Sequence, residues 1–262
     1  MSFKVLLLDN VDPLCSKILE ERGIETTTGG KMDEDTLFKT IPDYDGIVVR
    51  SGTTVTPELL EAAKNLKVVG RAGVGVDNID VDASTQSGVL VMNTPDGNTI
   101  STAEHTCGLI LSMARNIPVA VQTVKEGGWD RKKYTGTEVN GKKLGIIGLG
   151  KIGAEVAQRM KGFGMDIVAY DPFATHEKAE KLGVELKEMD EVLGEADFIT
   201  VHTPLTEKTK GLVSKENKDK LKKGVRLVNC ARGGIYKEED LLDLIEDGTV
   251  AGVALDAYTE EP

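Results

Sequence analysis

A run of glycines between an apolar stretch and a helix-like segment constrains the fold more than any other feature of this chain. Residues 144–147 are apolar and predict a buried strand, and three glycines follow at G-x-G-x-x-G spacing: Gly148, Gly150 and Gly153. A helix-like run covers residues 151–163, and a second strand-like stretch covers residues 166–170. The order strand, glycines, helix and strand predicts a βαβ unit with a glycine-lined first turn, which is far more specific than the glycine pattern alone.

Each of these residues has a physical reason to be there in a dinucleotide-binding unit. Gly148 allows the tight turn, Gly150 lets the backbone approach a pyrophosphate, and Gly153 lets the helix pack against the strand. Asp171 lies 18 residues after Gly153, where a carboxylate accepts both hydrogen bonds from an adenosine ribose. Its charge would repel a 2′-phosphate, and residues 172–175 contain no Arg or Lys, so NAD is favoured over NADP. The alternative is an ordinary α/β unit whose glycines serve only its turns.

Strand-like and helix-like segments also alternate through the first 95 residues. Expected strands cover residues 4–8, 47–49, 68–71 and 89–92, and expected helices cover 13–21, 57–64 and 80–87. Turn residues at 93–98 precede a long helix over about 99–115, and further strands are expected at 198–201, 225–229 and 252–255. We therefore expect an α/β protein with two doubly wound parallel-sheet domains, residues 1–97 and residues 98–262.

Composition narrows the possible partners. The net charge of −11 argues against nucleic acid or an anionic membrane surface, and an anionic substrate would need a local basic pocket. The apolar runs are too short to cross a bilayer, and the first residues predict a strand rather than a signal peptide. The three cysteines, Cys15, Cys107 and Cys230, are too far apart for a disulfide framework or a metal knuckle. We expect a reduced, cytoplasmic protein without a metal.

Polar residues follow the expected strands of the second domain, and ligands bind at such strand ends in open α/β sheets. They are Thr203 after residues 198–201, Cys230-Ala231-Arg232 after 225–229, and Asp256 after 252–255. Arg232 is placed to pair bidentately with a carboxylate next to a reacting carbonyl, which would orient the substrate. The alternatives are a surface or helix-end arginine for Arg232 and a solvated acidic turn for Asp256.

Several longer motifs, taken with the glycine run, make the chain similar to the D-isomer-specific 2-hydroxyacid dehydrogenases over essentially all 262 residues. They are Val49-Arg50-Ser51, Arg71 to Asn78, Val91 to Asn98, Trp129 to Lys133, Val201 to Pro204, Val228 to Gly234 and Ala254 to Pro262. The resemblance implies a flavodoxin-like substrate domain, without its C-terminal return segment, and a Rossmann NAD-binding domain. It also implies NAD-dependent oxidation of 3-phospho-D-glycerate to 3-phosphohydroxypyruvate, the first step of L-serine biosynthesis, by a homodimer or higher homo-oligomer.

The resemblance also implies a role for each matching residue. Lys151 and Ile152 resemble the pyrophosphate loop, and Thr203, Cys230, Ala231, Arg232 and Asp256 resemble residues that flank the cofactor. Arg232 also resembles the arginine that holds the substrate carboxylate, and Glu261 resembles the carboxylate that pairs with the catalytic histidine. Backbone N–H groups at Gly73, Val74 and Gly75 would bind a carboxylate oxygen. Arg50, Ser51 and Asn98 would line the substrate cleft, and Arg131 would reach the phosphate across a dimer interface.

The chain departs from the family pattern in two respects. Val74 stands where several relatives have Thr, so only its backbone is left to contact the cofactor. The family's catalytic histidine follows the Glu-Glu-Pro motif, and the 262 residues stop at Pro262. His105 falls in the long helix, His176 in a polar turn and His202 at a strand end, so none matches the acid/base position. We therefore expect these 262 residues to bind NADH but to turn over substrate poorly.

Two other functions fit the same residues. A related 2-hydroxyacid dehydrogenase acting on glyoxylate, hydroxypyruvate or lactate would not need a phosphate-binding cation such as Arg131. A non-catalytic NAD-binding regulator on the same fold would work by binding a partner, because a fold alone does not define a function.

Overall fold

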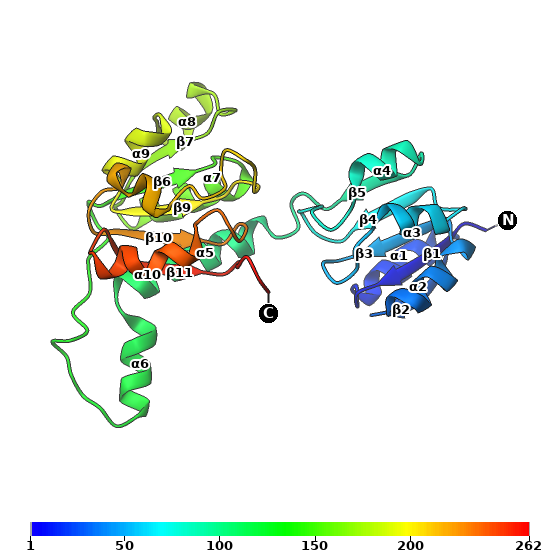
Figure 1. Cartoon of the computed structure of the whole chain (residues 1–262), viewed down its shortest axis with the longest axis horizontal. Helices are drawn as coiled ribbons and strands as arrows, with labels where there is room; N and C mark the ends of the chain where they lie inside the picture. Colours follow the sequence, from blue (N-terminus) through cyan, green and yellow to red (C-terminus); the bar gives the residue numbers. More distant parts are fainter. Residues whose placement is uncertain (1, 262) are drawn as a thin grey trace. The chain divides into compact units, whose positions relative to one another are not determined.

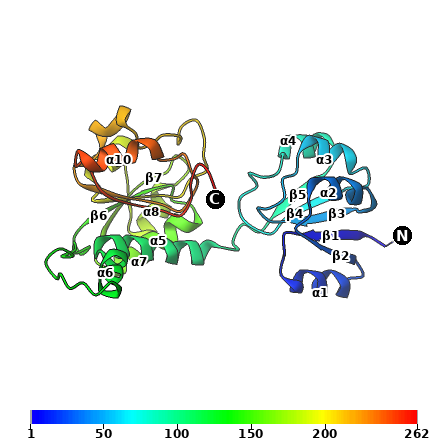
Figure 2. The same cartoon turned by 60° about the horizontal axis from the view of Figure 1, so that its bottom comes forward.

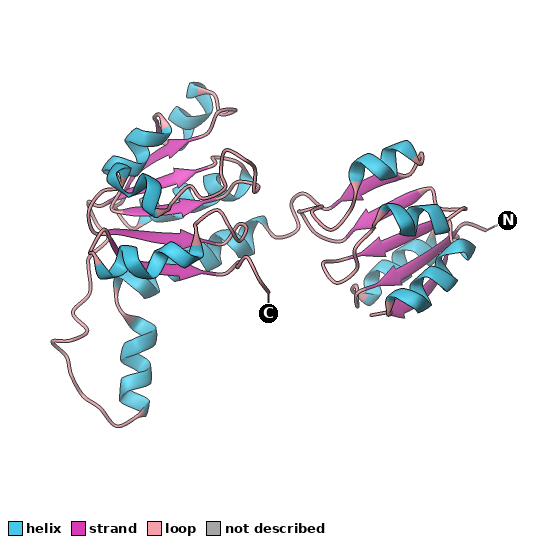
Figure 3. Ribbon diagram, in the orientation of Figure 1, coloured by secondary structure: helices cyan, strands magenta, loops and turns pink. Residues whose placement is uncertain are grey.

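The computed structural model in Figure 1 describes residues 2–261. The chain divides into two compact units, Met1–Asn98 and Thr99–Pro262, and each is built around its own parallel sheet. Figure 3 shows the strands of each sheet flanked by helices. The expected class, α/β with two doubly wound sheets, is confirmed.

The first unit has five parallel strands in the order β2-β1-β3-β4-β5, which is the flavodoxin-like order. The strands are β1 (Lys4–Leu8), β2 (Glu25–Gly30), β3 (Gly46–Val49), β4 (Val68–Arg71) and β5 (Leu90–Asn93). The connections are α1 (Pro13–Glu21), α2 (Glu34–Thr40) with the short η1 (Ile41–Asp43), α3 (Pro57–Ala62) and α4 (Val81–Gln86). Figure 2 shows α1 on one face of this sheet and α2, α3 and α4 on the other.

Local chemistry explains where the helices of the first unit begin. The side chains of Asp12, Asp33, Thr56 and Asp80 each accept a hydrogen bond from a backbone N–H in the first turn of the helix that follows. Apolar strand residues then close the core between the helices, and they include the buried Leu6, Leu8, Ile47, Val49 and Val69.

The second unit has six parallel strands in the order β11-β10-β9-β6-β7-β8. The strands are β6 (Lys143–Ile147), β7 (Asp166–Tyr170), β8 (Glu185–Leu186), β9 (Phe198–Val201), β10 (Val225–Asn229) and β11 (Val250–Leu255). Counted within the unit from β8, the order is 3-2-1-4-5-6, which is the Rossmann arrangement. The direction of winding reverses between β6 and β9, and the glycine turn after β6 therefore lies at the point where such sheets bind ligands.

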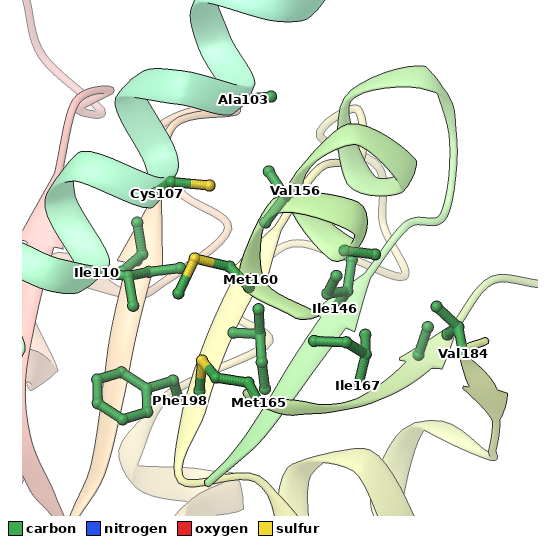
Figure 4. Close-up of a cluster of buried hydrophobic side chains, with 14 of the residues drawn as sticks. Ala103, Cys107, Ile110, Ile146, Val156, Met160, Met165, Ile167, Val184 and Phe198 are labelled. Carbon is green, nitrogen blue, oxygen red and sulfur yellow. The ribbon is translucent and has the colours of Figure 1, made fainter. Parts of the chain in front are cut away.

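Helices cover both faces of the second sheet. They are α5 (Thr99–Ala114), α6 (Ile117–Lys125), α7 (Lys151–Gly162), α8 (His176–Leu182), α9 (Met189–Glu195) and α10 (Glu238–Glu246), with a 3₁₀ segment η2 (Lys215–Lys220). Figure 4 shows Cys107 and Ile110 of α5 with Met160 of α7 in one buried cluster over the sheet. A second cluster on the opposite face contains Leu193 and Leu244.

Within residues 2–261, no single helix has the length and apolar character needed to cross a bilayer. Only α5 and α6 taken together reach that length and composition, and they are bent by 65° at the break between them.

Candidate active site

The glycine turn after β6 has the geometry that its spacing predicts. Gly148 has a φ of 97°, and a Cβ atom there would lie 2.6 Å from the carbonyl oxygen of His202. A Cβ at Gly153 would lie only 2.1 Å from the carbonyl oxygen of Gly148, because α7 packs directly against the turn. A Cβ at Gly150 would meet nothing within 4 Å, so open space remains beside the helix N-terminus. A phosphate could approach the backbone there.

The carboxylate of Asp171, at the end of β7, holds the middle of this turn. One oxygen accepts a hydrogen bond from the Leu149 N–H at 2.7 Å, and the other accepts one from the Phe173 N–H at 2.8 Å. Lys178 of α8 donates to the Leu149 carbonyl oxygen at 3.0 Å. Both polar groups of the Leu149 backbone are therefore bonded, and Leu149 itself is buried. Residues from the two neighbouring elements thus fix the turn before any ligand binds.

Lys178 was not identified from the sequence, because it follows Asp171 by seven residues and its contact depends on the position of α8. The sequence places His176 in a polar turn, and this is wrong: His176 is the first residue of α8, after the cap residue Thr175, whose hydroxyl accepts a hydrogen bond from the Lys178 N–H. A Ser/Thr cap in front of a charged helix was the available signal.

The end of β9 brings a partly buried histidine and a buried hydroxyl oxygen next to the glycine turn. The His202 N–H donates to the Ile147 carbonyl oxygen at 2.8 Å, and its ring nitrogen Nε2 lies 3.1 Å from the Thr200 hydroxyl. Burial lowers the pKa of His202 from 6.5 to about 4, so the ring is neutral at physiological pH. Within residues 2–261, the Thr203 hydroxyl oxygen is buried without a protein hydrogen-bond partner.

The turn after β10 carries Cys230, Ala231 and Arg232 and is held by Asn229. The Asn229 side chain accepts a hydrogen bond from the Ala231 N–H at 2.9 Å and donates one to the Arg232 carbonyl oxygen at 2.8 Å. The Arg232 guanidinium donates to the Ala231 carbonyl oxygen at 2.7 Å. The Asp256 N–H, at the end of β11, donates to the Asn229 carbonyl oxygen at 2.9 Å. Arg232 and Asp256 are therefore fixed on neighbouring strand ends.

The segment that carries Glu261 crosses the Arg232 turn. A Cβ at Gly233 would lie 2.1 Å from the backbone of Tyr258, so only glycine fits beneath this crossing. The segment is fastened by Glu238, whose carboxylate accepts hydrogen bonds from both the N–H and the hydroxyl of Thr259 at 2.8 Å. Glu261 is exposed, and its carboxylate accepts a hydrogen bond from the Tyr258 N–H at 2.9 Å.

The structure also brings His105 of α5 to these strand ends. Its Nε2 lies 3.2 Å from a carboxylate oxygen of Asp256, and both side chains are about half exposed. The Cys230 thiol lies within 4.8 Å of both groups. The sequence gives no signal for this contact, because the three residues are spread over more than 150 positions of the chain.

In the first unit, Asp9 organises the loop that contains Arg50 and Ser51. Its carboxylate, after β1, accepts hydrogen bonds from the N–H groups of Arg50 at 2.8 Å and Thr53 at 2.9 Å, and from the Thr53 hydroxyl at 2.8 Å. Asn78 donates to the Arg50 carbonyl oxygen at 2.7 Å from the other side. Arg50 and Ser51 are exposed at the end of β3. Asp9 was not identified from the sequence, although an acid directly after a buried strand is a usable signal.

Gly73, Val74 and Gly75 form the turn after β4, next to the end of β5. The Thr94 N–H donates to the Gly73 carbonyl oxygen at 3.0 Å, and the Asn93 side chain donates to the Val74 carbonyl oxygen at 2.7 Å. A Cβ at Gly73 would occupy the place of the Arg71 guanidinium, so a larger residue there would require the Arg71 side chain to move. Asn98 is exposed at the end of the unit.

Arg131 lies on an exposed segment after α6. Asp130 caps the turn that contains it by accepting hydrogen bonds from the N–H groups of Lys132 at 3.1 Å and Lys133 at 3.0 Å. Figure 1 shows α6 and this segment projecting from the body of the second unit.

A Rossmann-ordered sheet with a glycine turn and polar strand ends is typical of NAD-dependent dehydrogenases. A sequence profile described as the D-isomer specific 2-hydroxyacid dehydrogenase, NAD binding domain, matches residues 107–262. The match covers more than half of the chain, so the chain belongs to the D-isomer specific 2-hydroxyacid dehydrogenases, and its second unit is an NAD-binding domain. The expectation of NAD as cofactor is confirmed by this assignment.

Individual relatives match the chain over nearly its whole length. The D-3-phosphoglycerate dehydrogenases of Rattus norvegicus and Bacillus subtilis (strain 168) are 51% and 52% identical over 259 and 262 residues. Each match covers 99% of this chain and 49% of the relative, so the chain spans about half the length of these proteins. A solved glyoxylate reductase from Paecilomyes thermophila superposes with a TM-score of 0.90 at 29% identity, over 100% of this chain and 84% of that one.

The residues present fit an NAD molecule. Gly150 leaves room at the N-terminus of α7 for a pyrophosphate, and Asp171 retains acceptor capacity beyond its two backbone bonds. The buried Thr203 hydroxyl offers a donor and an acceptor that no group within residues 2–261 uses. A solved D-lactate dehydrogenase from Aquifex aeolicus, complexed with NAD and lactic acid, superposes with a TM-score of 0.85 at 28% identity, over 98% of this chain and 77% of that one.

Proposed function

We propose that this chain carries the cofactor-binding and substrate-binding residues of an NAD-dependent D-3-phosphoglycerate dehydrogenase. The reaction is oxidation of 3-phospho-D-glycerate to 3-phosphohydroxypyruvate, the first step of L-serine biosynthesis. The observation that carries the proposal is that Asn229 holds the Arg232 turn at the end of β10, at the same edge of the sheet as the glycine turn after β6. About half of the residues are identical to those of D-3-phosphoglycerate dehydrogenases, which supports this substrate over other 2-hydroxy acids.

The second unit supplies the cofactor contacts in this proposal. When bound, NAD accepts a hydride from the C2 carbon of the substrate. Asp171 binds the adenosine ribose, and the backbone N–H groups of Lys151 and Ile152 bind the pyrophosphate at the start of α7. Thr203, Cys230, Ala231 and Asp256 contact the remaining parts of the cofactor from the ends of β9, β10 and β11.

Arg232 binds and orients the substrate carboxylate, because a planar guanidinium makes two parallel hydrogen bonds to it. In the first unit, the backbone N–H groups of Val74 and Gly75 bind a carboxylate oxygen, since the Gly73 N–H already donates to the Arg71 carbonyl oxygen at 2.8 Å. Arg50, Ser51 and Asn98 contact the rest of the substrate. The loop of Arg50 and Ser51 is suited to this role because Asp9 and Asn78 fix its backbone from two sides.

Glu261 is the carboxylate partner of a proton-transferring histidine in this proposal. A carboxylate next to a histidine favours the protonated ring and raises its pKa. His202 does not suit proton transfer at neutral pH, because burial holds its pKa near 4 and the Thr200 hydroxyl engages its ring.

The proposed assembly is a homodimer formed through α6 in the cytoplasm. Nothing on α6 is buried, and Ile117, Val119, Val121 and Val124 are about half exposed, with Trp129 beyond them 78% exposed. An apolar projecting helix is best covered by the same helix of a second copy, because a twofold interface uses one patch twice. Arg131 follows on the same projecting segment and would reach the substrate phosphate of the other subunit. Three free cysteines favour a reducing compartment.

The proposal is tested by NADH consumption in the full-length protein with phosphohydroxypyruvate, glyoxylate, hydroxypyruvate and pyruvate as alternative substrates. We expect phosphohydroxypyruvate to have the highest kcat/KM. Arg232→Ala should abolish its reduction while NADH affinity and thermal stability stay nearly unchanged, and Arg232→Lys should also be poor, because an ammonium is a point charge. Near-normal kcat/KM in Arg232→Ala would refute the role of Arg232. Intact NADH binding without turnover of any 2-oxo acid would favour the regulator.

A further inference from the structure

Three metal-ligating side chains from distant parts of the chain meet at one end of the second sheet. Asn229 pairs with Leu255 in the register of β10 and β11, and the Asp256 N–H donates to the Asn229 carbonyl oxygen. Cys230 and Asp256 therefore follow the two strands at equivalent positions. Helix α5 packs along both strands and presents His105 to them. A regular parallel pair and a helix thus hold the three side chains together.

We propose that His105, Cys230 and Asp256 form a binding site for Zn²⁺, and that occupation of this site excludes NAD(H). The ligating atoms of the three side chains all lie within 4.8 Å of one another, and the His105 Nε2 and Asp256 carboxylate oxygen are 3.2 Å apart. Ordinary Zn–N, Zn–O and Zn–S bond lengths in a tetrahedron require ligand atoms about 3.3–3.6 Å apart. The observed atoms would have to approach one another by at most about 1.5 Å to reach this spacing.

The chemistry of the ligand set selects the cation. One imidazole nitrogen, one sulfur and one carboxylate oxygen suit Zn²⁺ and neighbouring transition metals, whereas Mg²⁺ and Ca²⁺ prefer oxygen ligands only. Three protein ligands leave the fourth tetrahedral position to water. His105 and Asp256 are about half exposed, so a hydrated cation can reach them from solvent.

Binding must displace the proton of Cys230. Burial raises the pKa of this thiol, a hydrogen bond with Thr106 opposes the rise, and the charge of Asp256 adds to it. Metal binding therefore replaces the thiol proton of Cys230 with the cation.

The competition with cofactor rests on the proposed function, which assigns Cys230 and Asp256 to NAD. A cation ligated by both side chains would withdraw them from the cofactor. Zinc would then act as a reversible inhibitor of cofactor binding. Only the cation contacts His105, so changing His105 should affect zinc binding and leave NAD binding unchanged.

Metal binding is measured first, without cofactor, by titrating the reduced full-length protein with Co²⁺ and displacing it with Zn²⁺. We expect one Co²⁺ per chain with a thiolate-to-metal absorption band, and Mg²⁺ should not compete. Cys230→Ser should abolish the band, and His105→Ala and Asp256→Asn should each weaken binding by more than about tenfold, since even groups that only orient a metal ligand are worth about 10–100-fold. His176→Ala and Cys15→Ser are matched controls and should bind normally.

The site is wrong if the band persists in Cys230→Ser, or if His105→Ala binds Co²⁺ as tightly as the unaltered protein. NADH affinity is then measured with and without Zn²⁺. We expect saturating Zn²⁺ to raise the apparent Kd for NADH in the unaltered protein but not in His105→Ala. Simultaneous binding of both ligands would overturn the exclusion. A failure to bind NADH without metal would count against the proposed cofactor site and leave the Co²⁺ result standing.

Discussion

At the residue scale, the site is held together by carboxylates and amides that bond to backbone groups. Asp171 bonds to the glycine turn, Asn229 bonds to the Arg232 turn, and Asp9 bonds to the loop of Arg50. The sequence predicts Asp171 because its spacing from the glycines is a property of the βαβ unit. Other contacts depend on how helices pack on the sheet, and no local sequence pattern predicts them. Examples are Lys178 with Leu149 and His105 with Asp256.

Replacing Asp171 should weaken cofactor binding strongly. Asp171→Ala removes the proposed ribose acceptor and also the bond to the Leu149 N–H, and we expect NADH affinity to fall by about 1.5–3 kcal/mol. Asp166→Ala is the matched control, because Asp166 is an exposed acid at the opposite end of the same strand. Isothermal titration with NADH measures the difference, and equal affinities for both variants would refute the assignment.

His202 should make stability depend on pH. Its folded pKa of about 4 lies below the ordinary 6.5, so the unfolded chain binds a proton that the folded chain does not. The stabilisation is therefore complete above about pH 6.5 and is lost as the pH falls toward 4. Between pH 7.5 and 4.5 this single group accounts for about 2–3 kcal/mol.

The measurement is urea unfolding at both pH values. His202→Asn should lose clearly less stability between them than the unaltered protein, because Asn does not titrate. His176→Ala, which changes an exposed histidine, should show the original pH dependence. An unchanged pH dependence in His202→Asn would show that the ring is not responsible.

At the element scale, the sequence predicts the exact bounds of several strands that have strong apolar patterns. It does not predict elements without such a pattern, such as β2 and α6. The expected bounds of β1, β7, β9 and β10 are those observed, because each is a short apolar run that the sheet buries. Strand β2 has the sequence Glu-Thr-Thr-Thr-Gly-Gly and no buried residue. It is an edge strand that pairs only with β1, so its conformation comes from its neighbour rather than from its own side chains.

Helix α6 was missed for a different reason. It begins with Ile117-Pro118, a residue pair that reads as the end of the preceding helix, and its apolar side chains show no buried face. Proline is favourable in the first turn of a helix, so Pro118 suits the start of α6. Asn116, with a φ of 55°, separates α6 from α5.

Within α7, two glycines should respond oppositely to the same change. Gly153→Ala places a Cβ 2.1 Å from the Gly148 carbonyl oxygen, so the helix and the turn must separate. We expect a loss of about 1–3 kcal/mol in unfolding free energy and a large loss of NADH affinity. Gly162→Ala meets nothing within 4 Å and should be neutral or stabilising by up to about 1 kcal/mol. Denaturant unfolding and NADH titration on both variants test this, and similar behaviour of the two would contradict it.

At the scale of the whole molecule, the sequence predicts a separate core for each unit. It does not predict the exposed apolar surface of α6. The alternation of strands and helices indicates two sheets, and the structure has one buried cluster in the first unit and two in the second. Helix α6 lies outside this alternation, and its apolar residues are not buried within the chain. In the proposed dimer the same helix of a second copy covers them.

Charge on α6 should prevent the proposed dimer. Val121→Glu combined with Val124→Glu puts two carboxylates on a helix with no buried residue, so the fold should persist while self-association is lost. Leu242→Glu is the matched control, because Leu242 is 65% exposed on α10. Light scattering after size exclusion should give a monomer for the α6 variant and a dimer for the control. A dimer in both would place the interface elsewhere.

The crossing of Tyr258 over Gly233 has a consequence for synthesis on the ribosome. The two residues are 25 positions apart, and translation adds about 5–20 residues per second. The glycine turn at residues 148–153 is made well before either, and Asp171 and Lys178, which bond to Leu149 within it, also precede the Arg232 turn. The Arg232 turn therefore reaches its final form only once residues 258 and 259 are in place, since Glu238 fastens Thr259 where the segment crosses Gly233.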